Sequence, residues 1–158
     1  MTVSIRDVAA YTLARESTMV TMKLHKLAFY AQAEHLVQHK SPLFPEDFRA
    51  WIVGPVSPQL YALHRGKLLI RPGELRSGDP STLTDAQRTL IDRVCAVMGS
   101  MTHAALSKRM YRELPWADAY ARHTPSLSHL MHLPIVTTDE IITHNAMLAY
   151  YSEHRLVC

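Results

Sequence analysis

The longest amphipathic pattern in the chain runs from about Met19 to His39 and predicts its longest helix. At about 100° per residue, its apolar side chains fall on two opposed faces. One face consists of leucine and alanine, and the other includes two aromatic rings. The first face is formed by Leu24, Leu27, Ala28 and Ala31, and the second by Phe29, Tyr30, Ala33, Leu36 and Val37. Narrow polar strips lie between the faces. A helix that is apolar on two faces packs on two sides, so we expect this helix at the centre of the fold.

Helix-start signals predict further helices around this one. Ser4 is placed to cap a first helix from Ile5, and Thr84 begins a capping box with Gln87. Ser57 followed by a proline predicts a short helix that Gly66 ends. Later helices are predicted after Thr102 (residues 103–113), from Pro115 (115–122) and after Thr137 or Thr138 (139–154).

Prolines and β-branched residues interrupt the helical pattern after the central helix. Leu43-Phe44 and the segment from Phe48 to Val53 are short and aromatic or β-branched, which favours strands. A small β-hairpin or a pair of short strands is therefore expected near residues 42–53. Residues 70–81 are predicted to form an exposed loop, and Ile135-Val136 is predicted to extend a strand. The whole pattern predicts a mainly α fold, a compact single-domain helical bundle of residues 1–158.

Composition narrows the class of protein. With 158 residues, of which 47% are hydrophobic, the chain has enough apolar surface for one core. The net charge of +3 is mild and scattered, which does not indicate a nucleic-acid surface. The two cysteines, Cys95 and Cys158, form no disulfide framework, and no apolar run is long enough to span a bilayer. We expect a soluble cytoplasmic protein without a membrane partner.

The sequence contains no motif that indicates catalysis. Glycine-rich phosphate loops and GxSxG are missing, so we expect no enzyme, no catalytic residue and no cofactor. His35 and His39 lie four residues apart and could reach one Zn²⁺ ion, with Glu34 nearby. Because the order is not HExxH and a third ligand is unspecified, we favour a solvated polar strip and predict no metal site. For His129 and His132, too, we predict no metal site. A metal-dependent enzyme remains the rival hypothesis.

The aromatic residues are a stronger lead to function. Trp51, Tyr61 and two phenylalanines crowd around Gly54-Pro55-Val56, a segment with little conformational freedom. A rigid aromatic surface loses little entropy when it binds another protein. The alternative is that these rings close the core over the central helix. For Trp51 and Phe48 we favour this role in the core. For Pro55, Val56 and Tyr61 we favour the core and a partner interface equally.

Four segments follow one another in the first half of the chain: KLHKLAFYAQA at 23–33, PLF at 42–44, FRAW at 48–51 and GPVSPQLY at 54–61. In this order they resemble the Panacea domain, also called the SocA-like antitoxin domain. Residues 106–116 resemble the family more loosely. Glu113, Pro115 and Trp116 match it there, whereas Met110 and Tyr111 stand where Thr and His are common. A role for the family's histidine is therefore not expected in this chain.

The resemblance implies a mostly helical antitoxin that neutralises a cognate protein toxin by direct contact. Some relatives are phage-associated, and others are thought to act as adaptors that deliver a toxin to a protease. The residues that we expect to bind the partner are Lys26, Trp51, Pro55, Val56 and Tyr61. Substitution of Lys26 or Tyr61 is expected to weaken binding and spare the melting temperature, whereas Trp51→Ala is expected to damage folding. A nucleic-acid-binding repressor is a further alternative, for which no basic helix or arm is present.

Overall fold

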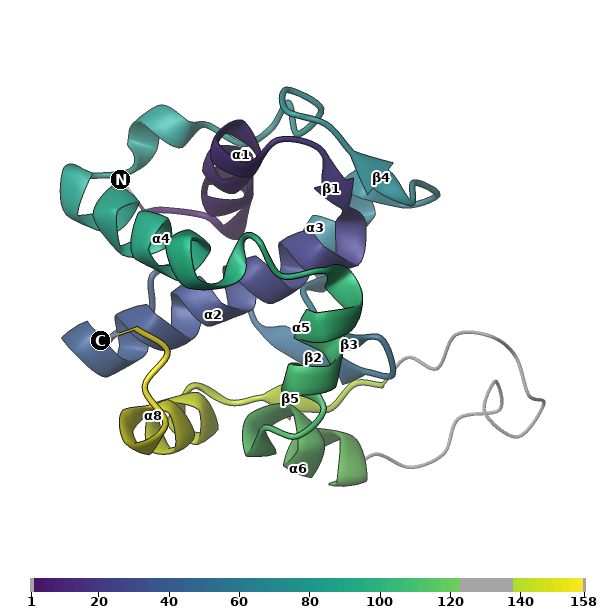
Figure 1. The fold of residues 1–158 in the computed structure, drawn as a ribbon, viewed down its shortest axis with the longest axis vertical. Coiled ribbons are helices and arrows are strands. Elements are labelled where there is room, and N and C mark those ends of the chain that lie inside the picture. Colours follow the sequence, from purple (N-terminus) through teal and green to yellow (C-terminus); the bar gives the residue numbers. More distant parts are fainter. Residues whose placement is uncertain (1, 123–137, 158) are drawn as a thin grey trace.

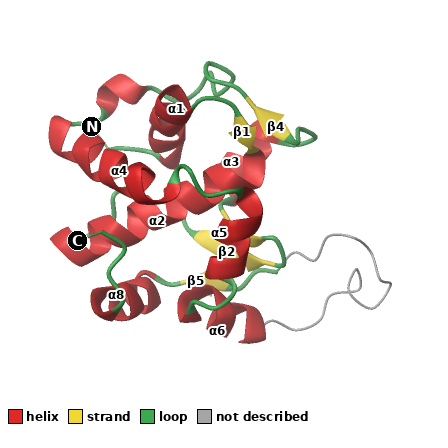
Figure 2. Ribbon diagram, viewed as in Figure 1, coloured by secondary structure: helices red, strands yellow, loops and turns green. Residues whose placement is uncertain are grey.

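A computed structural model describes residues 2–122 and 138–157. It confirms the mainly α fold: helices make most of it, and the strands are short and antiparallel (Figure 2). The helices are α1 (Ile5–Glu16), α2 (Thr21–His39), α3 (Pro58–His64), α4 (Asp85–Met98), α5 (His103–Met110), α6 (Leu114–Arg122) and α8 (His144–Glu153), with a 3₁₀ turn at Pro80–Thr82. The strands are β1 (Met19–Val20), β2 (Phe48–Trp51), β3 (Gly54–Val56), β4 (Leu69–Ile70) and β5 (Ile141–Ile142).

Helix α2 runs through the middle of the fold, as its two apolar faces predict. Helices α1 and α4 pack on one side of it, and α8 and the strand β3 pack on another (Figure 1). Three polar residues between its apolar faces are buried as well: His25 and Gln32 are inaccessible to solvent, and Glu34 is nearly so. A buried polar side chain needs hydrogen-bond partners inside the protein, and these partners organise much of the surrounding chain.

The partners of Gln32 and of Glu34 include residues in segments outside the helices and strands. The Gln32 side chain accepts a hydrogen bond from the Leu43 N–H at 2.7 Å and donates one to the Phe44 carbonyl oxygen at 2.8 Å. The Glu34 carboxylate accepts a hydrogen bond from Arg155, just after α8, at 2.8 Å. Helix α2 therefore fixes the loop before β2 and the end of the chain through its own side chains.

A buried carboxylate joins α2 to three further helices. Glu113, directly before α6, accepts hydrogen bonds from the hydroxyls of Tyr30 on α2 (2.6 Å) and Tyr151 on α8 (3.0 Å). Arg109 on α5 pairs with it at 3.2 Å and also lies over the Tyr30 ring. Burial and the nearby carboxylate raise the pKa of both tyrosines, so their hydroxyls stay protonated as donors. The Glu113 cluster, formed by these four residues, supplies the charge balance that a buried carboxylate requires.

A hairpin forms close to the predicted position, at residues 48–56. Strand β2 pairs with β3, so that Arg49 lies opposite Val56 and Trp51 opposite Gly54. Leu43-Phe44 is not a strand, because Gln32 takes up its backbone groups. Helix α2 begins at Thr21 rather than Met19, because β1 pairs with β4 and places Met19 opposite Ile70, a pairing that was not predicted.

The helix-start signals are confirmed at Ser4, Ser57, Thr84 and Thr102. The predicted start of the last helix is wrong. Thr143, not Thr137 or Thr138, caps α8, and the preceding Ile141–Ile142 forms β5 beside β2. Two consecutive β-branched residues favour pairing with the exposed edge of β2 over a helical turn. The expected strand at Ile135-Val136 lies outside the described residues.

Substitution of Glu113 tests whether its cluster stabilises the fold. Glu113→Leu removes the acceptor of two buried hydroxyls and the partner of Arg109, so we expect a loss of about 3 kcal/mol in the free energy of unfolding. Tyr151→Phe, the matched control, removes one donor and leaves the carboxylate paired, at a cost of about 1 kcal/mol. Urea denaturation measures both values. Equal losses in the two variants would show that the carboxylate does not hold the helices together.

Candidate partner-binding site

The turn between β2 and β3 is held by side chains from three helical segments. The carbonyl oxygens of residues 51–53 each accept one hydrogen bond at 2.8 Å. The donors are, in order, the Trp116 indole on α6, the Tyr111 hydroxyl after α5 and the Lys26 ammonium on α2. Because successive carbonyl groups are fixed from different directions, the turn has little freedom to move.

Lys26 lies beneath this turn and is only 1% exposed. Burial lowers the pKa of its ammonium group to about 8, so the group still carries a charge at neutral pH. Among the ion pairs of the described residues, none involves Lys26. Gly54 has φ +121°, and a Cβ atom there would lie 3.0 Å from Nζ of Lys26. Glycine therefore allows the hairpin to close over the lysine.

A chain of hydrogen bonds connects α2 to the start and end of α3. The backbone N–H of Ser57 can only donate, so Nδ1 of His25 accepts at 3.2 Å and carries no proton. The proton of the neutral His25 ring is then on Nε2, which donates to Nε2 of His64 at 2.7 Å. Burial lowers the pKa of both histidines, and the charge of Lys26 lowers that of His25 further. Both rings are therefore neutral in the folded protein near pH 7.

An apolar pocket of about 380 Å³ opens between this turn, α3, the start of α2 and the segment leading into β4. We refer to it as the Trp51 pocket; its lining includes Trp51, Val53, Tyr61, His64, Lys67 and Leu68. The Trp51 and Tyr61 rings meet edge to face, with their centroids 5.1 Å apart. Leu68, at the mouth, is 74% exposed. The pocket thus combines a rigid aromatic wall with an apolar rim.

The structure divides the five residues that the sequence analysis selected for partner binding. Trp51 and Tyr61 are half-buried and line the Trp51 pocket. Lys26, Pro55 and Val56 are buried. Substitution of any of these three residues should disturb the fold of the hairpin directly, whatever its effect on partner binding. We therefore no longer expect substitution of Lys26 to spare the melting temperature. Phe48 belongs to the core, in line with the reading favoured for it.

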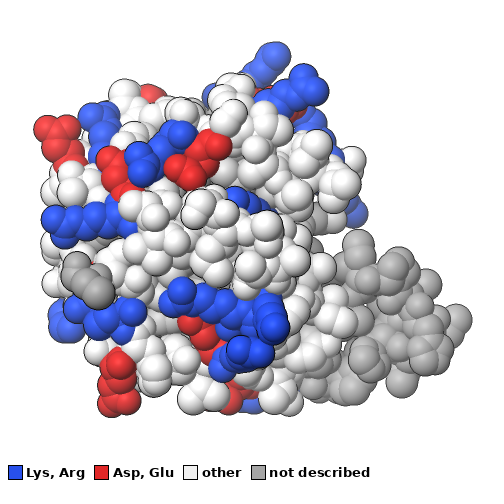
Figure 3. Space-filling view, viewed as in Figure 1, with Lys and Arg blue, Asp and Glu red and all other residues white. Residues whose placement is uncertain are grey.

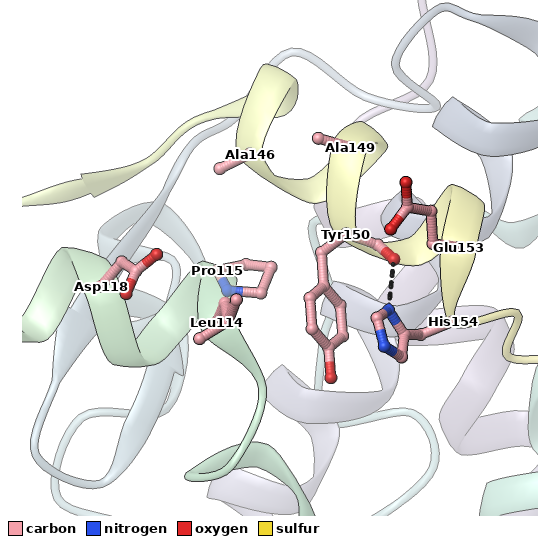
Figure 4. A pocket seen from close by; sticks show the side chains of 8 residues that line it. All are labelled: Leu114, Pro115, Asp118, Ala146, Ala149, Tyr150, Glu153 and His154. Carbon is pink, nitrogen blue, oxygen red and sulfur yellow. Dashed lines mark hydrogen bonds between the residues drawn. The ribbon is translucent and has the colours of Figure 1, made fainter.

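Helices α6 and α8 form the walls of a second pocket of about 350 Å³, which the sequence analysis did not identify. We refer to it as the Tyr150 pocket. At the edge of this pocket, the His154 ring stacks on the Tyr150 ring. Leu114 and Pro115 lie on the opposite side of the pocket (Figure 4). Its charged lining residues are Asp118 and Glu153. The two pockets therefore share an apolar character and differ in the charges at their rims.

The described residues do not assemble a metal site. The His35 and His39 rings lie 4.5 Å apart, and Nδ1 of His35 donates to the Ser41 carbonyl oxygen at 2.6 Å. Nowhere in residues 2–122 and 138–157 do three or more His, Cys, Asp or Glu side chains form a group that could hold a metal ion. His129, His132 and Cys158 lie outside the described residues.

Cys95 is buried in the core, as predicted, and this environment makes it a poor nucleophile. Burial is the main cause that raises the pKa of its thiol to about 12, so the reactive thiolate is scarce at neutral pH.

One face of the protein shows mixed charge. On the face drawn in Figure 3, Lys and Arg side chains are scattered, and the largest basic group, near α5 and α6, has acidic atoms beside it. No single basic stripe runs across this face. Of the helices that the structure describes, none is long and apolar enough to cross a membrane.

Sequence reasoning missed the parts of the site that come together over long separations. His25 and His64 are 39 positions apart, and no local pattern connects them. A run of apolar residues, Leu68-Leu69-Ile70, was the available signal for β4 and the pocket mouth, but no strand was predicted there and the exposed loop was predicted to begin at Ile70.

Acid should destabilise the protein through its buried histidine pair. The pKa of each ring is lower in the folded state than in the unfolded state, so the pair's stabilising contribution is complete above about pH 6.5 and is lost as pH falls below it. Urea unfolding between pH 7.5 and 5 should show a falling free energy of unfolding, with a shallower fall in His64→Gln. An unchanged slope in that variant would contradict the neutral pair.

Comparison with known proteins identifies a family. Residues 24–117, more than half of the chain, match the sequence model of the family described as antitoxin SocA-like, Panacea domain. No curated protein and no solved structure gives a significant match. The matched range contains most of α2, the hairpin, α3, α4, α5 and the start of α6, and with them nearly all of the Trp51 pocket. The chain belongs to the SocA-like antitoxin, Panacea domain family.

Proposed function

We propose that the protein is an antitoxin that binds a cognate protein toxin directly and neutralises it stoichiometrically in the cytoplasm. The family match over residues 24–117 is the observation that carries this proposal. In the complex, the surface around the Trp51 pocket contacts the toxin. The role is one of binding rather than catalysis.

The fixed turn supports binding at this surface. Ordering a mobile loop lowers affinity, because the free energy of ordering is subtracted from the interaction. Here the carbonyl groups of residues 51–53 are already fixed by Trp116, Tyr111 and Lys26 in the free protein. A toxin would therefore meet a surface that is already in its binding conformation.

An exposed apolar side chain supports the same surface. Leu68, which lines the Trp51 pocket, is 74% exposed. A solvent-exposed apolar side chain at a pocket is typical of protein-interaction sites. Leu68 shares the pocket lining with the half-buried Trp51 and Tyr61, which supply the aromatic anchors common in such sites.

A proteolytic adaptor is the second candidate function. An adaptor needs one surface for the toxin and another for the protease. The Tyr150 pocket, between α6 and α8, offers a second concave surface built from different elements than the Trp51 pocket. If this reading is right, the half-life of the toxin in cells falls when the antitoxin is present. A half-life that does not change would contradict the adaptor function and leave direct neutralisation as the only proposed function.

Co-expression with the product of the adjacent gene tests the proposal. The chain should restore growth in cells that express that protein, and the two should co-purify as a stable complex. Tyr61→Ala should weaken the complex by roughly tenfold or more, since aromatic residues in pockets carry much of the binding energy. Titration calorimetry measures this change, and a thermal melt of the free variant tests its fold.

Leu114→Ala is the matched control for this experiment, because Leu114 is an exposed residue of the other pocket. Its complex with the toxin should be as tight as that of the parent chain. Failure of the parent chain both to restore growth and to co-purify would refute the antitoxin proposal.

A further inference from the structure

We infer that the Trp51 pocket binds an apolar side chain of the toxin that stands next to a carboxylate. This inference rests on the proposed function, since it specifies the chemistry of the partner. The partner segment is then an acidic one with a single large apolar anchor, aromatic by preference. Shape and charge at the pocket support this choice separately.

The size and walls of the pocket fit a large apolar side chain. Its volume of about 380 Å³ is near the lower end for pockets that enclose small ligands, and it accommodates one aromatic side chain with part of its neighbour. The edge-to-face pair of Trp51 and Tyr61 offers an aromatic ring the offset contacts that such rings prefer. An anchor that fills the pocket also covers Leu68 at its mouth, which removes a large exposed apolar surface from water.

The charges around the pocket are positive. Lys67 lines it, and no Asp or Glu does. In the sequence, Arg49, Arg65, Lys67 and Arg71 lie between Asp47 and Glu74, with no acidic residue among them. Beneath the turn, the ammonium group of Lys26 adds a positive charge that no carboxylate of the described residues neutralises within 4 Å.

Two of these basic residues have acidic partners. Arg49 pairs with Asp139, away from the pocket lining, and Lys67 pairs with Glu74. The Lys67–Glu74 pair lies at the surface, where such a pair contributes little to stability. A toxin carboxylate can therefore replace Glu74 at little cost. Arg65 and Arg71 are exposed and have no ion pair within 4 Å among the described residues, so the region keeps a net positive charge.

The Tyr150 pocket provides a contrast within the same molecule. It is similar in size and also apolar, but its charged lining residues Asp118 and Glu153 are acidic, and neither Lys nor Arg lines it (Figure 4). An acidic segment would be repelled there. Charge therefore directs an apolar anchor with an acidic neighbour to the Trp51 pocket.

A pair of fluorescent dyes tests the pocket chemistry without the toxin. 8-Anilinonaphthalene-1-sulfonate is an aromatic anion, and N-phenyl-1-naphthylamine is its uncharged counterpart. Lys67→Glu should weaken binding of the anionic dye by roughly three- to tenfold and leave binding of the neutral dye nearly unchanged. Equal effects on the two dyes would show that the pocket does not select for negative charge and would overturn the inference.

Matched variants locate the dye. Leu68 and Leu114 are both exposed leucines at a pocket, so Leu68→Asp and Leu114→Asp place the same change at the two sites without disturbing the core. Binding of the anionic dye should fall at least tenfold in Leu68→Asp and stay unchanged in Leu114→Asp. The reverse result would place the dye in the Tyr150 pocket and contradict the inference.

Displacement by the toxin completes the test. Addition of one equivalent of the adjacent gene's product should release the anionic dye, and its fluorescence should fall. If the two proteins co-elute and the dye stays bound, the inference is wrong and the proposed function stands. If the parent chain forms no complex at all, the proposed function fails and the inference fails with it.

Discussion

The fold depends on the buried polar side chains of α2. In most helices of this kind, polar residues face water, but here His25, Lys26, Gln32 and Glu34 are enclosed by protein. Each must find a hydrogen-bond partner inside, because an unpaired buried polar group costs several times what a paired one contributes. The partners are backbone groups of the hairpin turn, the loop before β2 and the start of α3, together with Arg155 near the chain end. One helix therefore sets the positions of several irregular segments.

This arrangement explains how a small helical protein fixes the surface around the Trp51 pocket. Apolar packing alone would hold the helices and leave the turn at residues 51–53 to move. Hydrogen bonds from Lys26, Tyr111 and Trp116 fix that turn, and the His25–His64 pair fixes α3 beside it. The Trp51 pocket lies between these two fixed segments. The residues that give the family its sequence pattern thus act largely below the surface, while Leu68 and Lys67 are exposed at the pocket where we propose that the partner binds.

Much of the fold could be predicted because the signals are local. Ser4 and Thr84 cap helices through residues three positions away, and the two faces of α2 follow from its periodicity. The pairing of β2 could not be predicted, because Leu43-Phe44 has strand-like residues whose backbone groups Gln32 occupies. Of the residues selected for partner binding, Trp51 and Tyr61 line the Trp51 pocket, whereas Lys26 is buried beneath the turn. Burial of a lysine depends on a distant carbonyl group, that of Val53, which no spacing reveals.

The central claim is that α2 holds the proposed binding surface in place through polar side chains such as Lys26. Amide hydrogen exchange of Lys26→Met, which keeps the apolar stem of the side chain and removes its ammonium group, tests this most directly. Exchange in a peptide covering residues 51–56 should become at least about tenfold faster, while the amides of α2 stay protected, because opening of the turn is local. Unchanged protection of the turn in a folded Lys26→Met protein would contradict the claim.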